Sequence, residues 1–163
     1  MPNAAIENTI MASLLTRIRG LTGYTTSNVI WVPKFIEPPA HPAFTNGPFV
    51  EIENPQIEPF GPGGGSYVQK ITIDIGVFYR SESDPKHDWS KILYRVNEAA
   101  ATIRKRICGQ MPGGMHVPLY DSGQQQSARP LLVGAEGLEV KGVIWAAFAV
   151  WGLYGQRIED FVS

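Results

Sequence analysis

Apolar residues recur at helical spacing in two segments of the chain. The first stripe lies on one face of residues 4–19, and Gly20 follows it as a C-cap; its members are Ile6, Ile10, Leu14 and Ile18. The second stripe lies within residues 89–107; its members are Ile92, Val96, Ala99, Ile103 and Ile107. We therefore predict two amphipathic helices, the first capped by Asn3 and the second by Asp88.

Other segments carry the patterns of β-strands. Short apolar runs at residues 28–32 and 49–53 predict two strands, and 129–134 is a further candidate. Residues 67–80 alternate with a nearly clean period of two, which predicts a long strand with one buried and one largely wet face. Residues 138–154 are apolar on both faces, so we expect a strand that is covered on both sides.

Proline and glycine separate these elements. Residues 33–48 hold five prolines, which exclude a helix there. We predict loops at 54–66, which is rich in proline and glycine, and at 110–127, which is long enough to suggest a functional role. Both loops have few apolar anchors, so we expect them to be mobile in the free subunit and ordered in an assembly.

The order of these elements predicts an α+β fold, with a mostly antiparallel β-sheet and two α-helices packed on one face. A length of 163 residues favours a single domain, 1–163. Hydrophobic residues make up 44% and charged residues 18%, which is enough apolar material for a folded core.

Charge and cysteine content narrow the classes of function. The formal net charge is −1, which argues against electrostatic or sequence-specific binding of nucleic acid. Cys108 is the single cysteine, so no internal disulfide forms, and we expect a buried, inert thiol. The start of the chain does not read as a signal peptide, and the apolar stretch 142–154 is too short for a membrane-spanning helix.

No group of residues in the sequence has both the spacing and the neighbours that a catalytic or metal-binding site requires. Glu51 and Glu53 share one face of a strand and could form an acid/base pair, but a solvent-facing sheet edge fits them better. The glycine-rich run 61–66 lacks the Gly-Lys-Ser/Thr ending of a phosphate loop. The histidines and the acidic turn at 82–88 match no metal-binding pattern. We therefore predict no catalytic, metal or cofactor site.

The clearest indication of function in the sequence is an apolar sheet face that the predicted elements leave uncovered. The two helices can cover one face of the sheet, and no further element is left for the other. We expect a subunit interface there, formed by Phe78, Trp145, Phe148 and Trp151. A sheet that curls on itself is the alternative explanation.

The layout resembles that of the tail terminator, or tail completion, proteins of tailed bacteriophages. The resemblance rests on a short helix ending in Leu21-Thr22-Gly23, a proline-rich piece leading to Pro48-Phe49-Val50-Glu51-Ile52, a long strand ending in Val77-Phe78-Tyr79-Arg80, a second helix and a closing apolar strand. It covers residues 5–155 and is one of size and order of elements.

The resemblance implies a non-enzymatic virion protein, present in the host cytoplasm during assembly. It implies a homo-oligomeric ring, a hexamer, that caps the tail tube, ends tail polymerisation and binds a neck or head-connector protein, with DNA passing through the ring. The two long loops would face the channel or a neighbouring ring; their candidate contact residues are Phe60, Gly63, Gly64, Met111, Met115, His116, Leu119 and Tyr120. A head-closure or adaptor protein of the neck is an alternative, and a small enzyme with a spatially assembled site is a third.

Overall fold

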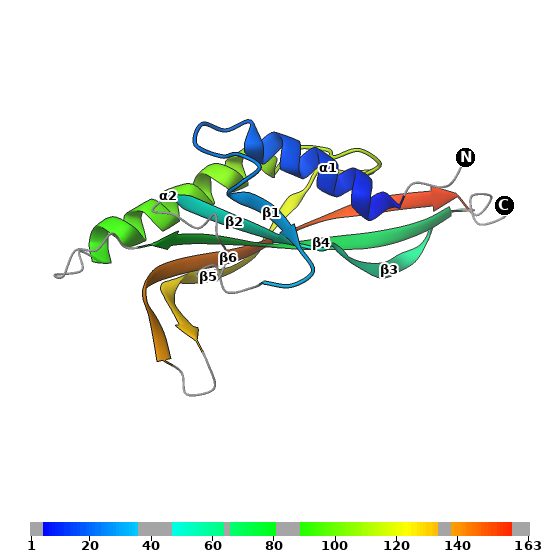
Figure 1. Ribbon diagram of the computed structural model, residues 1–163. Coiled ribbons are helices and arrows are strands. Elements are labelled where there is room, and N and C mark those ends of the chain that lie inside the picture. Colours follow the sequence, from blue (N-terminus) through cyan, green and yellow to red (C-terminus); the bar gives the residue numbers. More distant parts are fainter. Residues whose placement is uncertain (1–4, 36–46, 64–65, 81–88, 134–137, 158–163) are drawn as a thin grey trace.

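The protein is described here from a computed structural model that places residues 5–35, 47–63, 66–80, 89–133 and 138–157. Two helices and six strands follow one another as α1 (Ile6–Arg19), β1 (Val29–Val32), β2 (Pro48–Glu53), β3 (Gln56–Gly63), β4 (Ser66–Arg80), α2 (Trp89–Ile107), β5 (Tyr120–Val133) and β6 (Leu138–Arg157). Both helices cover the same face of one sheet (Figure 1). The predicted α+β fold is confirmed.

The sheet is built around a long central pair, β4 and β6. The strand order is β1-β2-β4-β6-β5, with β3 also paired to β4. Only β1 and β2 are parallel among the described pairs. Since β6 pairs with the whole length of β4, β2 and β3 must lie end to end along the other edge of β4. Residues 48–63 are therefore the first half of one long hairpin, and β4 is its returning half.

The predicted loop at 54–66 is wrong for this reason. Residues 56–63 form β3, which pairs with β4 from Gln56↔Thr72 to Gly63↔Ser66. Pro59 is tolerated because β3 lies at an edge, where its missing N–H breaks no ladder on the outer side. The ladder shifts register between Pro59 and Gly61, so a β-bulge at Phe60 absorbs the irregular sequence.

The core lies between the helices and the sheet. α1 contributes Ile10, Met11, Leu14 and Ile18, and α2 contributes Ala99, Ala100, Ile103 and Ile107. The sheet contributes alternate residues of β4, namely Ile71, Ile73, Ile75 and Val77, as the period of two predicts. At the start of α1 the N-cap position is Ala5, which makes no side-chain cap; Asn3 and Asp88 fall outside the described residues.

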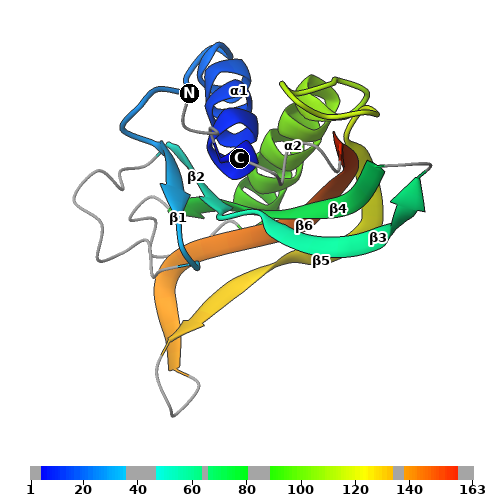
Figure 2. The same ribbon diagram turned by 90° about the vertical axis from the view of Figure 1, so that its right-hand side faces the viewer.

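β5 and β6 extend beyond the body as a two-stranded arm on the side away from the helices (Figure 1). The arm consists of residues 131–133 of β5 and 138–142 of β6, which lie beyond the last pairs of β6 with β4, and the view in Figure 2 shows the same projection. The ladder shifts register between Pro130 and Leu132, where the partner position on β6 moves from Ile144 to Glu139. Extra residues in one strand bend a ribbon, so this irregularity explains why the arm turns away.

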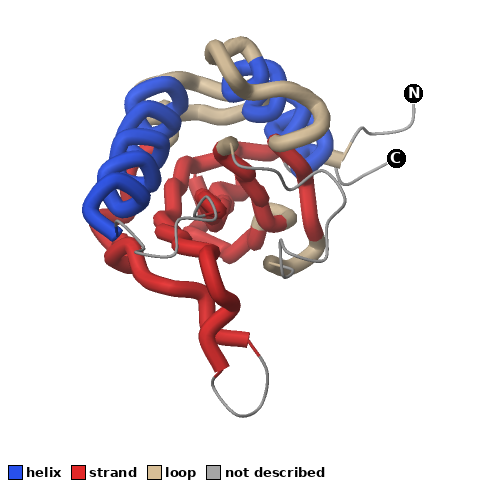
Figure 3. The backbone as a smooth tube through the Cα atoms, turned by 60° about the vertical axis from the view of Figure 1, so that its left-hand side comes forward, coloured by secondary structure: helices blue, strands red, loops and turns tan. Residues whose placement is uncertain are grey.

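The second predicted loop, at 110–127, is also partly wrong. Only residues up to 119 of the 110–127 segment are loop, because β5 begins at Tyr120. The sheet as a whole is curled, with both helices on its outer side (Figure 3). The face without helices is thus the inner face of the curl.

Candidate assembly surface

The helix-free face of the sheet is made by the residues that alternate with the core positions. Cross-strand register places Phe78 beside Trp145 and Thr72 beside Trp151 on this face. At the two ends of this face, the side chains are covered by other residues to different extents. We call the part around Phe78 the arm end, and the part around Trp151, nearer to the start of β4, the tip end.

At the arm end, aromatic rings cover one another. The rings of Phe78 and Trp145 stack with centroids 5.8 Å apart and planes 11° apart. Phe35, which follows β1, meets both rings edge-on, at 6.4 and 6.2 Å. Phe78 is only 1% exposed. A Cβ on Gly76 would lie 2.9 Å from the Phe78 ring, so this glycine leaves the room that the cluster needs.

The prediction that Phe78 lies on uncovered apolar surface is therefore wrong. Phe35 supplies the missing cover, and at this end the subunit covers its own sheet. The backbone N–H of Phe35 donates a hydrogen bond of 2.9 Å to the carboxylate of Glu53, which holds the segment in place. Trp145 is half-buried in the same cluster.

Phe148 is also buried, for a different reason. It pairs with Ile75 and so lies on the helix side of β6, where it is 3% exposed and part of the core. The guanidinium of Arg104 on α2 lies 4.7 Å from the centre of its ring, within the range of a cation–π contact. The prediction that Phe148 faces an open surface is wrong, because α2 covers it.

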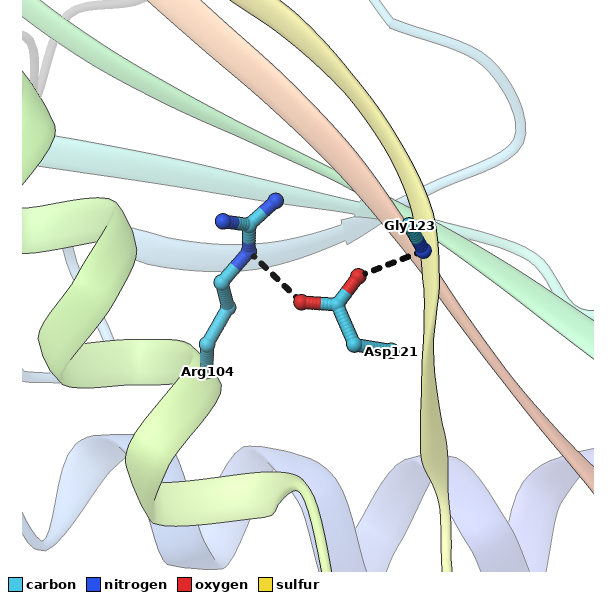
Figure 4. Close-up of polar contacts among 3 residues, drawn as sticks. All are labelled: Arg104, Asp121 and Gly123. Atoms are coloured by element: carbon cyan, nitrogen blue, oxygen red, sulfur yellow. Dashed lines mark hydrogen bonds and ion pairs between the residues drawn. The ribbon is translucent and has the colours of Figure 1, made fainter.

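Arg104 also ties α2 to the beginning of β5 (Figure 4). Its Nε lies 3.2 Å from Oδ2 of Asp121, and the N–H of Gly123 donates to Oδ1 of the same carboxylate at 2.9 Å. Gly123 has a φ of 73°, a conformation that glycine adopts without strain. The β5–β6 ladder shifts between Asp121 and Gln125, so these contacts lie at the bulge that follows Tyr120.

At the tip end, aromatic rings remain accessible. Tyr120 lies opposite Trp151 in the ladder, and their ring centroids are 5.0 Å apart. The ammonium of Lys70 lies 5.2 Å from the centre of the Trp151 ring. Tyr120 is 44% exposed, and Trp151 is half-buried. These three residues form a mixed aromatic and basic cluster that a partner can reach, and Trp151 and Tyr120 remain candidate contact residues.

Two more exposed aromatic residues lie close to the turn of the β3–β4 hairpin. Phe60, at the bulge of β3, is 58% exposed, and Tyr67, at the start of β4, is 50% exposed. Gly63 is the last residue of β3, and Gly64 falls outside the described residues.

The loop from 110 to 119 packs on the body instead of projecting from it. Its apolar anchors Met115 and Leu119 are 4% and 0% exposed and belong to the core. The N–H of His116 donates to the carbonyl of Leu153 at 2.7 Å, and the imidazole lies directly over Gly155, in the space that a Cβ there would take.

Of the contact residues proposed for this loop, Met115 and Leu119 are therefore inside the subunit. Their prediction as contacts to another ring is wrong, because apolar anchors fold a loop onto a core that can accept them. Met111 and His116 are exposed. They stay candidates.

Carboxylates gather on the helix-free face beside the aromatic cluster. Glu51 is fully buried, because β2 lies between β1 and β4, so the prediction of a solvent-facing edge is wrong for it. Burial raises the pKa of the Asp74 carboxyl, and the negative charge of Glu53 raises it further. The main cause is the loss of solvent around the Asp74 carboxyl, and repulsion from Glu53 adds to it.

Other candidate chemistry is limited. Cys108 is half-buried, and burial raises the pKa of its thiol, which lowers the fraction of reactive thiolate. Within the described residues, no group of three potential ligands could hold a metal ion. No helix in the described part of the chain is long and apolar enough to cross a membrane.

Comparisons with known proteins bear on the fold. No family model and no curated protein sequence matches the chain. Among solved structures, the fold matches a chain from the virion of a native gene transfer agent particle, with a TM-score of 0.56 and 12% sequence identity. That match covers 94% of this chain and 100% of the other. The two chains share a fold.

A second solved structure is 13% identical over 93% of each chain. Its TM-score of 0.44 is too low to carry an argument. The first match includes the whole of the virion chain, so the shared fold extends over both helices and the sheet and not over a local motif.

Sequence reasoning missed the role of Phe35 and the strand at 56–63. Nothing in the sequence around Phe35 distinguishes it from the other apolar residues of the proline-rich segment. The strand did have a signal. Gly64-Gly65 separates two segments that can pair, and a two-residue glycine turn is typical of a tight β-hairpin.

Proposed function

We propose that this protein is a structural subunit of a virion and, more specifically, a tail terminator. The observation that carries the proposal is the fold shared with a gene transfer agent virion chain over 94% of this chain and all of that one. The order of elements over residues 5–155, which resembles the tail terminators of tailed phages, supports the finer assignment.

The geometry of the subunit suits this role. A cap must match the end of the tail tube on one face and present a different face that does not continue the tube. A closed ring of head-to-tail contacts stops lateral growth and still offers two unlike faces. This subunit has an outer side covered by helices, an inner sheet face and a projecting arm (Figures 1 and 3), so its sides are unlike one another.

The proposed ring is a hexamer that contacts the tail tube protein on one side and a neck or head-connector protein on the other. DNA would pass through it, without sequence-specific contacts. The proposed role is one of assembly and not of catalysis. The accessible contact candidates are Trp151 and Tyr120 at the tip end, together with Phe60, Met111 and His116.

Deletion of the gene from its parent phage tests the proposal. We expect tails of irregular or excessive length that fail to join filled heads, and plasmid-borne wild-type protein should restore normal particles. Tails of normal length that lack heads would indicate a head-closure or adaptor role in the neck. Normal tails joined to filled heads would contradict any role in completing the tail.

A further inference from the structure

We propose that Arg19 closes the free edge of β1 against the addition of a strand from another copy of this chain. Within the described residues, β1 is an edge strand and pairs only with β2. Such an edge offers unpaired N–H and C=O groups to any extended strand that approaches it. The inference goes beyond the proposed function, because it concerns a contact that the fold prevents, and it holds whether or not the chain forms a ring.

The hydrogen bonds between β1 and β2 show which way each backbone group of β1 points. The C=O groups of Asn28 and Val32 accept hydrogen bonds of 2.7 and 2.8 Å from the N–H of Val50 and from that of the residue after β2. Successive residues of a strand direct their backbone groups to alternate sides of the strand. The N–H and C=O groups of Val29 and Trp31 therefore point away from β2, into the free edge.

Both outward groups of Val29 are bonded to the chain's own residues. The N–H donates to the C=O of Thr25 at 3.1 Å. The C=O accepts two hydrogen bonds from the guanidinium of Arg19, at 2.7 Å from Nη2 and at 3.2 Å from Nε. Arg19 is the last residue of α1, which packs beside β1 (Figure 1). A basic residue in this position usually binds the last carbonyls of its own helix, whereas Arg19 binds a carbonyl of the strand edge.

At the other end of β1, a proline limits the open edge. Pro33 follows the strand directly and has no N–H to donate. Trp31 is then the one residue of β1 whose outward N–H and C=O bond to no other described residue. A single open residue gives an added strand two hydrogen bonds at most, which is too little to offset the entropy lost on docking. Without Arg19, the C=O of Val29 would become a further acceptor beside that of Trp31.

The other free edges of the described sheet are irregular. The β3 edge has the bulge at Phe60, and the ladder of β5 with β6 shifts register at three places. Irregular edges resist strand addition, because their N–H and C=O groups are out of step with a regular partner. All four residues of β1 are in regular register with β2, so β1 lacks this protection. The contact with Arg19 supplies it.

Sedimentation velocity of Arg19→Met tests the proposal. This change removes the donors and the charge, and it keeps an unbranched side chain with good helix propensity. Arg17→Met is the matched control, because it removes the same charge from the same helix at a guanidinium that donates to Oε1 of Gln110, at 2.8 Å, and to no strand. Each variant is compared with wild type at equal concentration, so the comparison does not depend on the oligomeric state of wild type.

We expect Arg19→Met to form dimers of the wild-type species, because β1 would pair with β1 of a second copy about a two-fold axis. The association constant should rise at least about fivefold, the factor that one backbone hydrogen bond contributes on net. Arg17→Met should sediment as wild type does. If Arg19→Met lowers the melting temperature without adding dimers, Arg19 only fastens α1 to β1, and the inference is overturned.

Two changes at position 31, made in the Arg19→Met background, test whether the new contact uses the strand edge. Trp31→Pro removes the outward N–H, and an edge position tolerates proline. Trp31→Ala removes the same side chain and keeps the N–H. We expect Trp31→Pro to abolish the additional dimers and Trp31→Ala to retain them. The same result from both changes would mean that the contact does not use this backbone group, which overturns the inference.

Amide hydrogen exchange of the wild-type protein, read at single residues, does not depend on the folding of any variant. At concentrations where wild type is fully associated, the N–H of Trp31 should exchange at least about tenfold faster than that of Val29, because only the latter has an acceptor. Equal protection of the two amides would mean that the β1 edge is paired in the assembly and would overturn the inference. A wild-type chain that stays monomeric would contradict the proposed ring and leave the inference standing.

Discussion

The aromatic cluster at the arm end gives a sharp prediction about stability. Phe78 is 1% exposed, stacks on Trp145 with centroids 5.8 Å apart and meets Phe35 edge-on. If these rings stabilise the subunit itself, Phe78→Ala must lower the free energy of unfolding of the isolated chain. If the cluster were instead an interface, the same change would weaken association and leave the isolated chain intact.

The expected size of the loss follows from the burial. Replacing a buried phenylalanine by alanine costs about 3–5 kcal/mol, since both transfer energy and packing are lost. For a chain of this length, 1 kcal/mol changes the midpoint of thermal unfolding by about 2–4 °C. We therefore expect Phe78→Ala to lower the midpoint by roughly 6–20 °C. Phe78→Leu, which keeps most of the volume, should cost less than about 1.5 kcal/mol.

Urea unfolding at low protein concentration, followed by tryptophan fluorescence, is the assay. Low concentration keeps association out of the measured free energy. Phe60→Ala is the matched control, because Phe60 is 58% exposed, and we expect it to change stability by no more than about 0.5 kcal/mol. Equal stability of Phe78→Ala and wild type would refute the reasoning.

Two further predictions concern charge and packing. Burial and the charge of Glu53 raise the pKa of Asp74, so the folded state keeps the proton on this carboxyl group to higher pH than the unfolded state does. The free energy of unfolding therefore falls as pH rises above 3.8, the ordinary pKa of this group. Asp74→Asn should therefore be more stable than wild type at pH 7 in thermal melts, and this gain should vanish below pH 3.8; a gain that does not change with pH would contradict the cause. Gly152→Ala should cost about 1–3 kcal/mol in urea titrations, because the buried side chains of Met115 and Leu119 fill the space that the new methyl group would take. Gly155→Ala should cost less than about 0.5 kcal/mol, because only the exposed ring of His116 has to turn aside, and equal costs for the two changes would contradict this reasoning.

Local patterns were enough to predict most of the fold. The helix at 89–107 and the long strands at 66–80 and 138–157 match their predicted positions closely, because each carries a long and regular apolar period. The grouping of both helices on one face followed from the order of elements alone. The parallel pairing of β1 and β2 was not predicted, since it depends on the path of residues between them.

Errors arose where tertiary context overrides local composition. Proline and glycine suggested a loop at 54–66, but the edge of a long β4 accepts an irregular partner strand there. The segment after 119 looked polar and loop-like, yet pairing with β6 makes it a strand, with a bulge fixed by Asp121 and Gly123. Pairing over a long distance in sequence is not visible in a local window.

The candidate surface was predicted only in part. The count of apolar faces correctly implied that the second face of β6 needs cover, but a single aromatic residue, Phe35, supplies it at the arm end. Met115 and Leu119 were chosen as exposed anchors because they stand out in a polar loop. Those anchors insert into the core, since the sequence does not reveal which apolar loop residues find a place there.

The central claim, that this protein caps a phage tail as a ring, is tested most directly by cryo-electron microscopy of particles from its parent phage. The account predicts one ring of this fold at the head-proximal end of the tail tube. A single copy, a ring within the head, or tails complete without this protein would contradict it.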